Sequence, residues 1–120
     1  MKVLYIEPFK PPCVVEIEHT LSEMRRLVDG DLACTYPWSD PVGLCHNDNA
    51  IAEGQPFNRV LENYDIIRGP FFLAGLGVDD FTDLAPELIE KYTEKFRYPE
   101  FFIPAPDGHI AVIRVVEAPL

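Results

Sequence analysis

The chain has 120 residues, of which 48% are hydrophobic and 25% are charged, and its formal net charge is −10. This length suits a single domain with its own hydrophobic core, and the composition excludes an intrinsically disordered chain. No apolar run reaches the roughly 20 residues of a membrane-spanning helix. The excess of acidic side chains excludes direct nucleic-acid binding through a basic surface.

The first half of the chain predicts four strands and one helix. Thr20 and Glu23 form a capping box, Met24 and Leu27 recur at helical spacing, and Gly30 suits the left-handed position after the helix. The helix is therefore expected to be about ten residues long. Short β-rich runs bounded by proline or turn residues predict strands at 2–8, 13–18, 31–38 and 42–47.

The second half begins with a segment rich in turn residues. Asn47 and Asn49 tolerate positive φ, so residues 50–54 could return as a short strand. From Asn58 the chain predicts either a helical turn or an extended continuation. The apolar segment 65–77 predicts a central strand pair or one bent strand, because Gly69 and Pro70 interrupt it.

A second helix is predicted from Pro86 to Phe96, since proline suits a first helical turn and the apolar residues between them recur at helical spacing. The last predicted strand, 109–118, is apolar on both faces, so both faces should be covered by this domain's helices or by another subunit. Together the elements predict an α+β fold in one domain, 1–120: one mostly antiparallel sheet with two helices packed on it.

The cysteine and histidine residues do not predict a metal site. Cys13, Cys34 and Cys45 are odd in number and widely spaced, which indicates reduced, buried thiols in an intracellular protein. Adjacent strand residues point to opposite faces, so Cys45 and His46 would not share one ion. A nucleophilic group of Cys45 and His109 is conceivable, but acidic surroundings raise a thiol pKa. We therefore assign no catalytic residue, and we expect no metal and no cofactor.

Asn58 and Arg59 are the best candidates for ligand contact. Their side chains offer donors for an anionic or planar ligand, and Arg68 could face the same space. The alternative for Arg59 is an internal ion pair with one of the 20 acidic residues. Tyr36 and Trp38 could stack against a base, although aromatic side chains in small domains more often belong to the core.

Five further stretches follow one another in the chain: "MKVLYIEP", "YPWSDPVGLCHND", "GQPFNRVL", "YDIIRGPFFLAGLGVDDFTDL" and "IEKYTEKFRYPEFF". In this order they resemble a family of small phage and mobile-element proteins described as a domain of unknown function (number 3846). The resemblance spans residues 1–102, and 103–120 would be an additional C-terminal strand. It implies action in a bacterial cytoplasm, and it supplies no catalytic residues.

Three functions are compatible with these observations. The leading hypothesis is a non-enzymatic binding protein of phage type that sequesters an anionic, nucleotide-type host immune signal. Asn58, Arg59 and Arg68 would hold its phosphate, and Trp38 or Tyr36 would stack on its base. The second is an acidic protein–protein inhibitor or DNA mimic acting on a host defence protein. The third is a small cytoplasmic enzyme that uses a histidine. We further expect a homo-oligomer, most simply a dimer, with the last strand near its interface.

Overall fold

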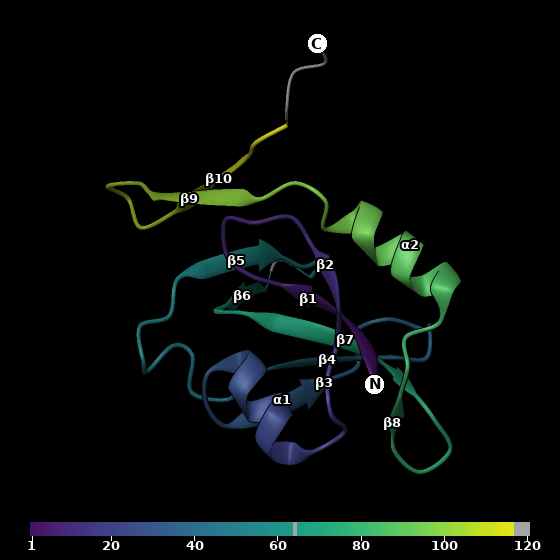
Figure 1. Cartoon of the computed structure of the whole chain (residues 1–120). Helices are drawn as coiled ribbons and strands as arrows, with labels where there is room; N and C mark the ends of the chain where they lie inside the picture. Colours follow the sequence, from purple (N-terminus) through teal and green to yellow (C-terminus); the bar gives the residue numbers. More distant parts are fainter. Residues whose placement is uncertain (64, 117–120) are drawn as a thin grey trace.

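The computed structural model describes residues 1–63 and 65–116 (Figure 1). The helices in this part are α1 (Leu21–Val28) and α2 (Pro86–Lys95). The strands are β1 (Lys2–Ile6), β2 (Cys13–Glu16), β3 (Leu32–Thr35), β4 (Val42–Asn47), β5 (Phe57–Val60), β6 (Ile66–Arg68), β7 (Phe71–Leu76), β8 (Phe81–Thr82), β9 (Glu100–Pro104) and β10 (Ile110–Arg114). The mixture of two helices with antiparallel strands confirms the predicted α+β class.

The strands divide into three antiparallel sheets, whereas the sequence predicted one. The main sheet has the order β2-β1-β7-β4-β3, and β8 pairs with β7. β5 pairs with β6, and β9 pairs with β10. Gly69 causes part of this division: its φ of 75° turns the chain between β6 and β7, so the apolar segment 65–77 contributes to two sheets. A left-handed φ of this kind favours glycine.

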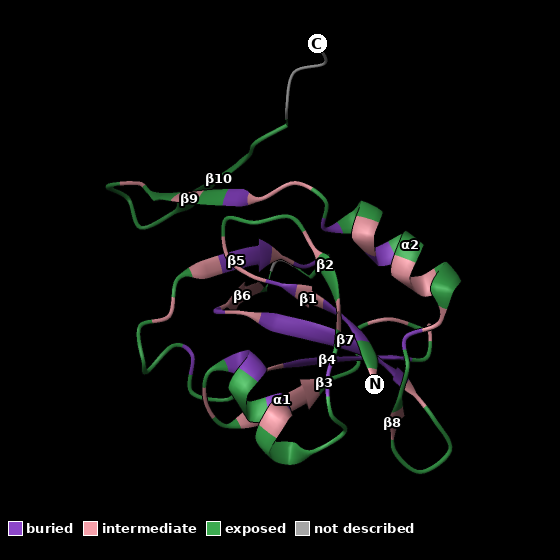
Figure 2. Cartoon of the chain, viewed as in Figure 1, coloured by how far each residue is buried: buried purple, intermediate pink, exposed green. Residues whose placement is uncertain are grey.

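The two helices cover opposite faces of the main sheet. Side chains alternate between the faces along a strand. On β7, Phe71 joins the buried cluster that contains Tyr92 of α2. Its neighbour Phe72 joins the cluster that contains Leu27 of α1. Both faces of β7 are therefore buried, and Figure 2 colours nearly all of this strand as buried. Each large apolar side chain withdrawn from water contributes about 1.5–3 kcal/mol.

The predicted start of α1 is confirmed, but its end differs. Thr20 accepts a hydrogen bond from the backbone N–H of Glu23 at 3.2 Å. At the C-terminal end Asp29, and not Gly30, takes the left-handed conformation, with φ of 56°. Gly30 is needed for a different reason: a Cβ at this position would lie 2.4 Å from Nδ2 of Asn47.

The second helix follows the prediction closely. Pro86 occupies its first turn, Tyr92 is buried and Phe96 forms its C-cap. Within the described ranges, neither helix is long and apolar enough to cross a membrane.

The structure resolves the conformations that the sequence left open for residues 50–54 and for the chain from Asn58. Residues 50–54 form turns and not a strand, and the chain from Asn58 is extended in β5. The last predicted strand is shorter, β10, and residues 117 and 118 lie outside the described residues. All five residues of β10 are exposed, so the helices of this domain do not cover it.

Candidate functional site

Asn58 and Arg59 both point into the protein, although they are consecutive residues of one strand. Asn58 is 0% exposed and Arg59 is 1% exposed. The register of β5 against β6 shifts between Phe57 and Arg59. Such a bulge re-aims side chains, which explains how two neighbouring residues can both be buried.

The amide of Asn58 joins three parts of the chain. Its Nδ2 donates to the carbonyl of Ile6 at 2.9 Å and to the carbonyl of Gly69 at 2.8 Å. Its Oδ1 accepts from Nη1 of Arg59 at 2.8 Å. Asn58 therefore ties β5 to the end of β1 and to the turn between β6 and β7.

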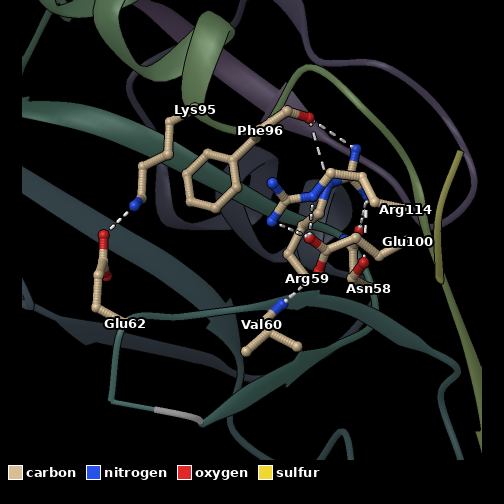
Figure 3. A network of polar contacts seen from close by, with 8 residues as sticks. All are labelled: Asn58, Arg59, Val60, Glu62, Lys95, Phe96, Glu100 and Arg114. Atoms are coloured by element: carbon tan, nitrogen blue, oxygen red, sulfur yellow. Dashed lines mark hydrogen bonds and ion pairs between the residues drawn. The ribbon is translucent and has the colours of Figure 1, made fainter. Parts of the chain in front are cut away.

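The guanidinium group of Arg59 is held by backbone carbonyls and by Asn58 (Figure 3). Nη2 donates to Lys10 O at 2.7 Å and to Phe96 O at 3.0 Å. The Phe96 carbonyl lies at the C-terminal end of α2, where the helix dipole favours a positive charge. Burial lowers the pKa of Arg59 to about 10, so the group stays charged at neutral pH.

We call this network the arginine clasp: Asn58, Arg59 and the carbonyls of Lys10 and Phe96. The sequence suggested that Asn58 and Arg59 bind an anionic ligand together with Arg68. In the structure their donors are directed at internal acceptors, and neither residue lines the two cavities described below. The internal alternative describes Arg59 better, with carbonyl partners in place of the expected acidic side chain.

Glu100 extends the clasp toward the C-terminal hairpin. It is buried, and it accepts hydrogen bonds from the backbone N–H of Val60 at 2.8 Å and from Arg114 at 3.2 and 3.0 Å. The sequence analysis missed Glu100, because nothing local distinguishes this acid from the other 19.

Arg68 lies in a different environment from Arg59. Its guanidinium carbon is 4.6 Å from the centre of the Phe57 ring, and its Nε donates to Gln55 O at 2.8 Å. Arg68 lines a cavity of about 390 Å³ whose other walls are residues 46–52, Ile66 and Ile67. We call this space the Arg68 cavity.

The polar wall of the Arg68 cavity is fixed by Asn47. Its Nδ2 donates to Asp29 O at 3.0 Å and to Glu53 at 2.9 Å, and its Oδ1 accepts from the backbone N–H of Asn49 at 2.7 Å. Asn49 in turn donates to Asp31 at 3.3 Å. Side chains of this type stabilise turns by bonding to nearby backbone. The sequence identified the turn, but not its role as a wall.

The composition of the Arg68 cavity suits a small molecule with an anionic part. Arg68 provides nitrogen donors, His46 a ring nitrogen, Asn49 an amide, and Ile66 and Ile67 an apolar surface. Small-molecule sites commonly occupy roughly 300–1,000 Å³ and combine apolar walls with a few polar groups. The cavity falls within this range.

The predicted aromatic contacts lie away from the Arg68 cavity. Trp38 packs on Tyr92 of α2, with ring centres 4.6 Å apart, and its indole N–H donates to Glu62. Tyr36 is 60% exposed and lines a second cavity of about 530 Å³ with Leu76, Gly77, Asp79, Asp80 and Phe81. Tyr64, a further aromatic residue close to these loops in the sequence, lies outside the described residues.

The five predicted site residues therefore do not form one site, and among these five described residues only Asn58 and Arg59 are hydrogen-bonded to each other. Asn58 and Arg59 form the arginine clasp, Arg68 lines its own cavity, Trp38 packs against α2 and Tyr36 lines the second cavity.

The cysteines differ from the prediction in their exposure. Cys45 is buried as expected, but Cys34 is half-buried and Cys13 is exposed. Cys45 packs in the cluster under α1, whereas His46 lines the Arg68 cavity on the other side of β4. Among residues 1–63 and 65–116, no group of three or more His, Cys, Asp or Glu side chains has an arrangement that could hold a metal ion.

A family model described as "Domain of unknown function (DUF3846)" matches residues 1–97. No curated protein and no solved structure matches the chain. The match begins at the first residue, as the resemblance did, and ends just after α2. It includes β1–β8 and both helices, so the arginine clasp residues and the Arg68 cavity lie within it, while the β9–β10 hairpin lies beyond it. The chain belongs to the DUF3846 family.

Proposed function

We propose that the protein is a non-enzymatic binding protein that holds a small anionic, nucleotide-type ligand in the Arg68 cavity. The observation that carries this proposal is the placement of Arg68 at the wall of a cavity of suitable size. Arg68 uses its Nε for Gln55, and within the described ranges its two terminal nitrogens have no hydrogen-bond partner. They remain free to donate to a ligand.

Phosphate is the anion that this arrangement suits. The two terminal N–H groups of a guanidinium form a planar fork that matches two phosphate oxygens. The Phe57 ring packs against this guanidinium group, with its centre 4.6 Å from the guanidinium carbon. His46 lines the same cavity and adds an imidazole ring to its polar surface. With a net charge of −10, long-range attraction of an anion is weak, so these local contacts must supply the affinity.

The apolar wall of the Arg68 cavity suits the base of a nucleotide-type ligand. Ile66 and Ile67 form a surface against which a flat ring can pack, and Asn49 can bond to the edge of a base.

In the proposed biological role, the protein acts in a bacterial cytoplasm as a phage-type sponge for a nucleotide-type host immune signal. This role includes no chemical step, so the ligand would be released unchanged.

Calorimetric titration with cyclic nucleotides, ADP-ribose and inorganic phosphate tests the proposal. We expect at least one nucleotide to bind the parent protein and Arg68→Ala to lose that binding. Arg97→Ala is the matched control, because Arg97 pairs with Glu94 on the surface. Absence of binding by every probe, or equal binding by Arg68→Ala, would refute the site. Conversion of a bound nucleotide to a product that disappears in His46→Ala would refute the non-enzymatic role.

The β9–β10 hairpin supports the expected homo-oligomer. Val112 in the middle of β10 is 43% exposed, and the strand pairs on one side with β9. Its neighbours Ala111, Ile113 and Val115 are also exposed, and Figure 2 colours the chain along β10 as exposed. An exposed apolar edge strand tends to pair with another strand, and an antiparallel edge is complementary to a second copy of itself.

The local charges favour a second copy as the occupant of this edge. Arg114 pairs with Glu100 at 3.0 Å, and His109 pairs with Asp107 at 2.8 Å. In the described part of the hairpin, Glu100 thus has the opposite charge of Arg114 beside it, and Asp107 has the imidazole of His109 as a hydrogen-bond partner. Two hairpins can approach without the repulsion that the acidic remainder of the chain would cause.

The hydrogen-bond register indicates which residue to change. His109 O accepts from Ala105 and the backbone N–H of Val115 donates to Pro99, so odd-numbered residues of β10 bond toward β9. The alternation of an antiparallel ladder then directs the backbone groups of Val112 outward.

We expect light scattering to show a dimer for the parent and a monomer for Val112→Lys. Val78→Lys, at a fully exposed position, is the control. A monomeric parent would refute the dimer.

A further inference from the structure

Cys34 and Cys45 lie directly opposite each other on β3 and β4. Their Sγ atoms are 2.9 Å apart. The third cysteine, Cys13, is on β2 at the other edge of the main sheet. The register of the sheet thus brings together two of the three thiols, which are separated by 11 positions in the sequence.

The geometry of this pair fits a disulfide with little movement. Directly opposite residues of antiparallel strands have Cα atoms about 4.5 or 5.5 Å apart, and both values fall within the range of disulfides, about 4.4–6.8 Å. The bond itself is about 2.05 Å long, so the two sulfur atoms need to approach by roughly 0.9 Å. A side-chain adjustment can supply this without a shift of either strand.

The two thiols differ in a way that suits a reaction in two steps. Cys34 is half-buried on the edge strand β3, whereas Cys45 is fully buried. The hydrogen bond from Cys45 lowers the pKa of Cys34. The same bond and burial raise the pKa of Cys45. Cys34 is therefore the accessible thiol that more readily forms a thiolate, and a thiolate is the form that attacks a disulfide.

We propose that Cys34 and Cys45 form a two-thiol oxidation site that closes by exchange with a low-molecular-weight disulfide. The Cys34 thiolate attacks one sulfur of this disulfide, which forms a mixed disulfide and releases one thiolate. Cys45 then attacks Sγ of Cys34, transfers its proton to the second departing sulfur and closes the cross-strand bond. Two protein thiols are oxidised, and one small disulfide is reduced to two thiols.

The bond would fix an edge of the sheet next to the Arg68 cavity. Cys45 immediately precedes His46, which lines this cavity, and β3 is paired on one side with β4. A cross-link restricts the unfolded chain and so stabilises the folded state. We expect the oxidised protein to melt at a higher temperature than the reduced protein.

Treatment of the reduced, folded protein with oxidised glutathione tests the site. After the remaining thiols are alkylated, non-reducing peptide mapping should show Cys34 joined to Cys45 and Cys13 outside this bond. Cys13→Ser should form the same link. Cys45→Ser should accumulate a lasting glutathione adduct at Cys34, because the second thiol is missing.

The parent protein alone can overturn the proposal, so the test does not depend on whether a variant folds. If Cys34 and Cys45 both remain alkylatable after the parent is oxidised, the proposal is wrong. It is also wrong if Cys13 is the preferred partner of either cysteine. Cys34→Ser provides a further criterion: it should acquire no adduct at Cys45 while its near-ultraviolet circular dichroism matches the parent, and adduct formation there would contradict the assigned order of attack.

Discussion

The guanidinium group of Arg59 donates to the carbonyl oxygen of Phe96 through two nitrogen atoms, Nε at 3.3 Å and Nη2 at 3.0 Å. These residues are 37 positions apart. The contact joins β5 to the C-terminal end of α2, where unpaired helix carbonyls need donors. Both groups are buried, so their bonding contributes to the fold more strongly than an exposed contact would.

Loss of the Arg59 side chain should destabilise the protein. Arg59→Ala leaves the Phe96 and Lys10 carbonyls without these donors, and it also leaves a void in the core. We expect a loss of about 3–5 kcal/mol in the free energy of unfolding, measured by urea denaturation. Arg97→Ala removes a surface arginine and should change it by less than about 0.5 kcal/mol. Similar effects of the two variants would contradict the structural role of the clasp.

The docking of α2 should depend on Phe96. Its ring lies 5.5 Å from that of Phe71 in β7 and 6.0 Å from that of Trp38. Phe96→Ala should lower the free energy of unfolding by about 3–5 kcal/mol, because it removes a buried aromatic side chain and leaves a cavity. Glu90→Ala, on the exposed side of the same helix, is the control. A Phe96→Ala protein that melts like the parent would show that α2 is peripheral.

Glu100 should hold the base of the C-terminal hairpin. Glu100→Ala removes the acceptor of the Val60 N–H and the partner of Arg114. An unpaired buried donor costs about 1–3 kcal/mol. We expect faster hydrogen exchange at the Val60 amide and along β10. Exposed Glu94→Ala should leave both unchanged, and unaltered exchange in Glu100→Ala would show that the hairpin is held by other contacts.

Tyr5 should make stability depend on alkaline pH. Its hydroxyl donates to Leu27 O at 2.8 Å, and burial raises its pKa from 10.0 to about 12. The folded state therefore retains this proton in a range where the unfolded state has lost it. The stabilisation is fully present below pH 10 and is lost as the pH rises toward about 12.

Urea denaturation at several pH values between 9 and about 11.5 would measure the contribution of Tyr5, and Tyr5→Phe is the comparison. The variant should be less stable by about 1 kcal/mol at neutral pH, because it lacks the hydrogen bond. Its stability should then fall less steeply than that of the parent above pH 10. Parallel curves for the two proteins would contradict the proposed proton linkage.

Elements with local signals were predictable from the sequence. The capping contact of Thr20 with Glu23 and the proline at the start of α2 lie within the helices they begin. The uninterrupted apolar run of residues 71–74 indicated a strand at the centre of the fold, because a strand that is buried on both faces shows no polar alternation. The ordered motifs also identified the family, which the match over residues 1–97 confirms.

The contacts of the polar residues depend on the tertiary fold and were not predictable from local sequence. The pair Asn58–Arg59 has the same local sequence whether its donors face a ligand or the carbonyl of Lys10, which is 49 positions away. The approach of Cys34 to Cys45 depends on the register between β3 and β4, and neither thiol signals the other along the chain. Side-chain chemistry defines what a residue can bind, but long-range packing places its partners, and packing here buries Arg59 and leaves Arg68 at a cavity.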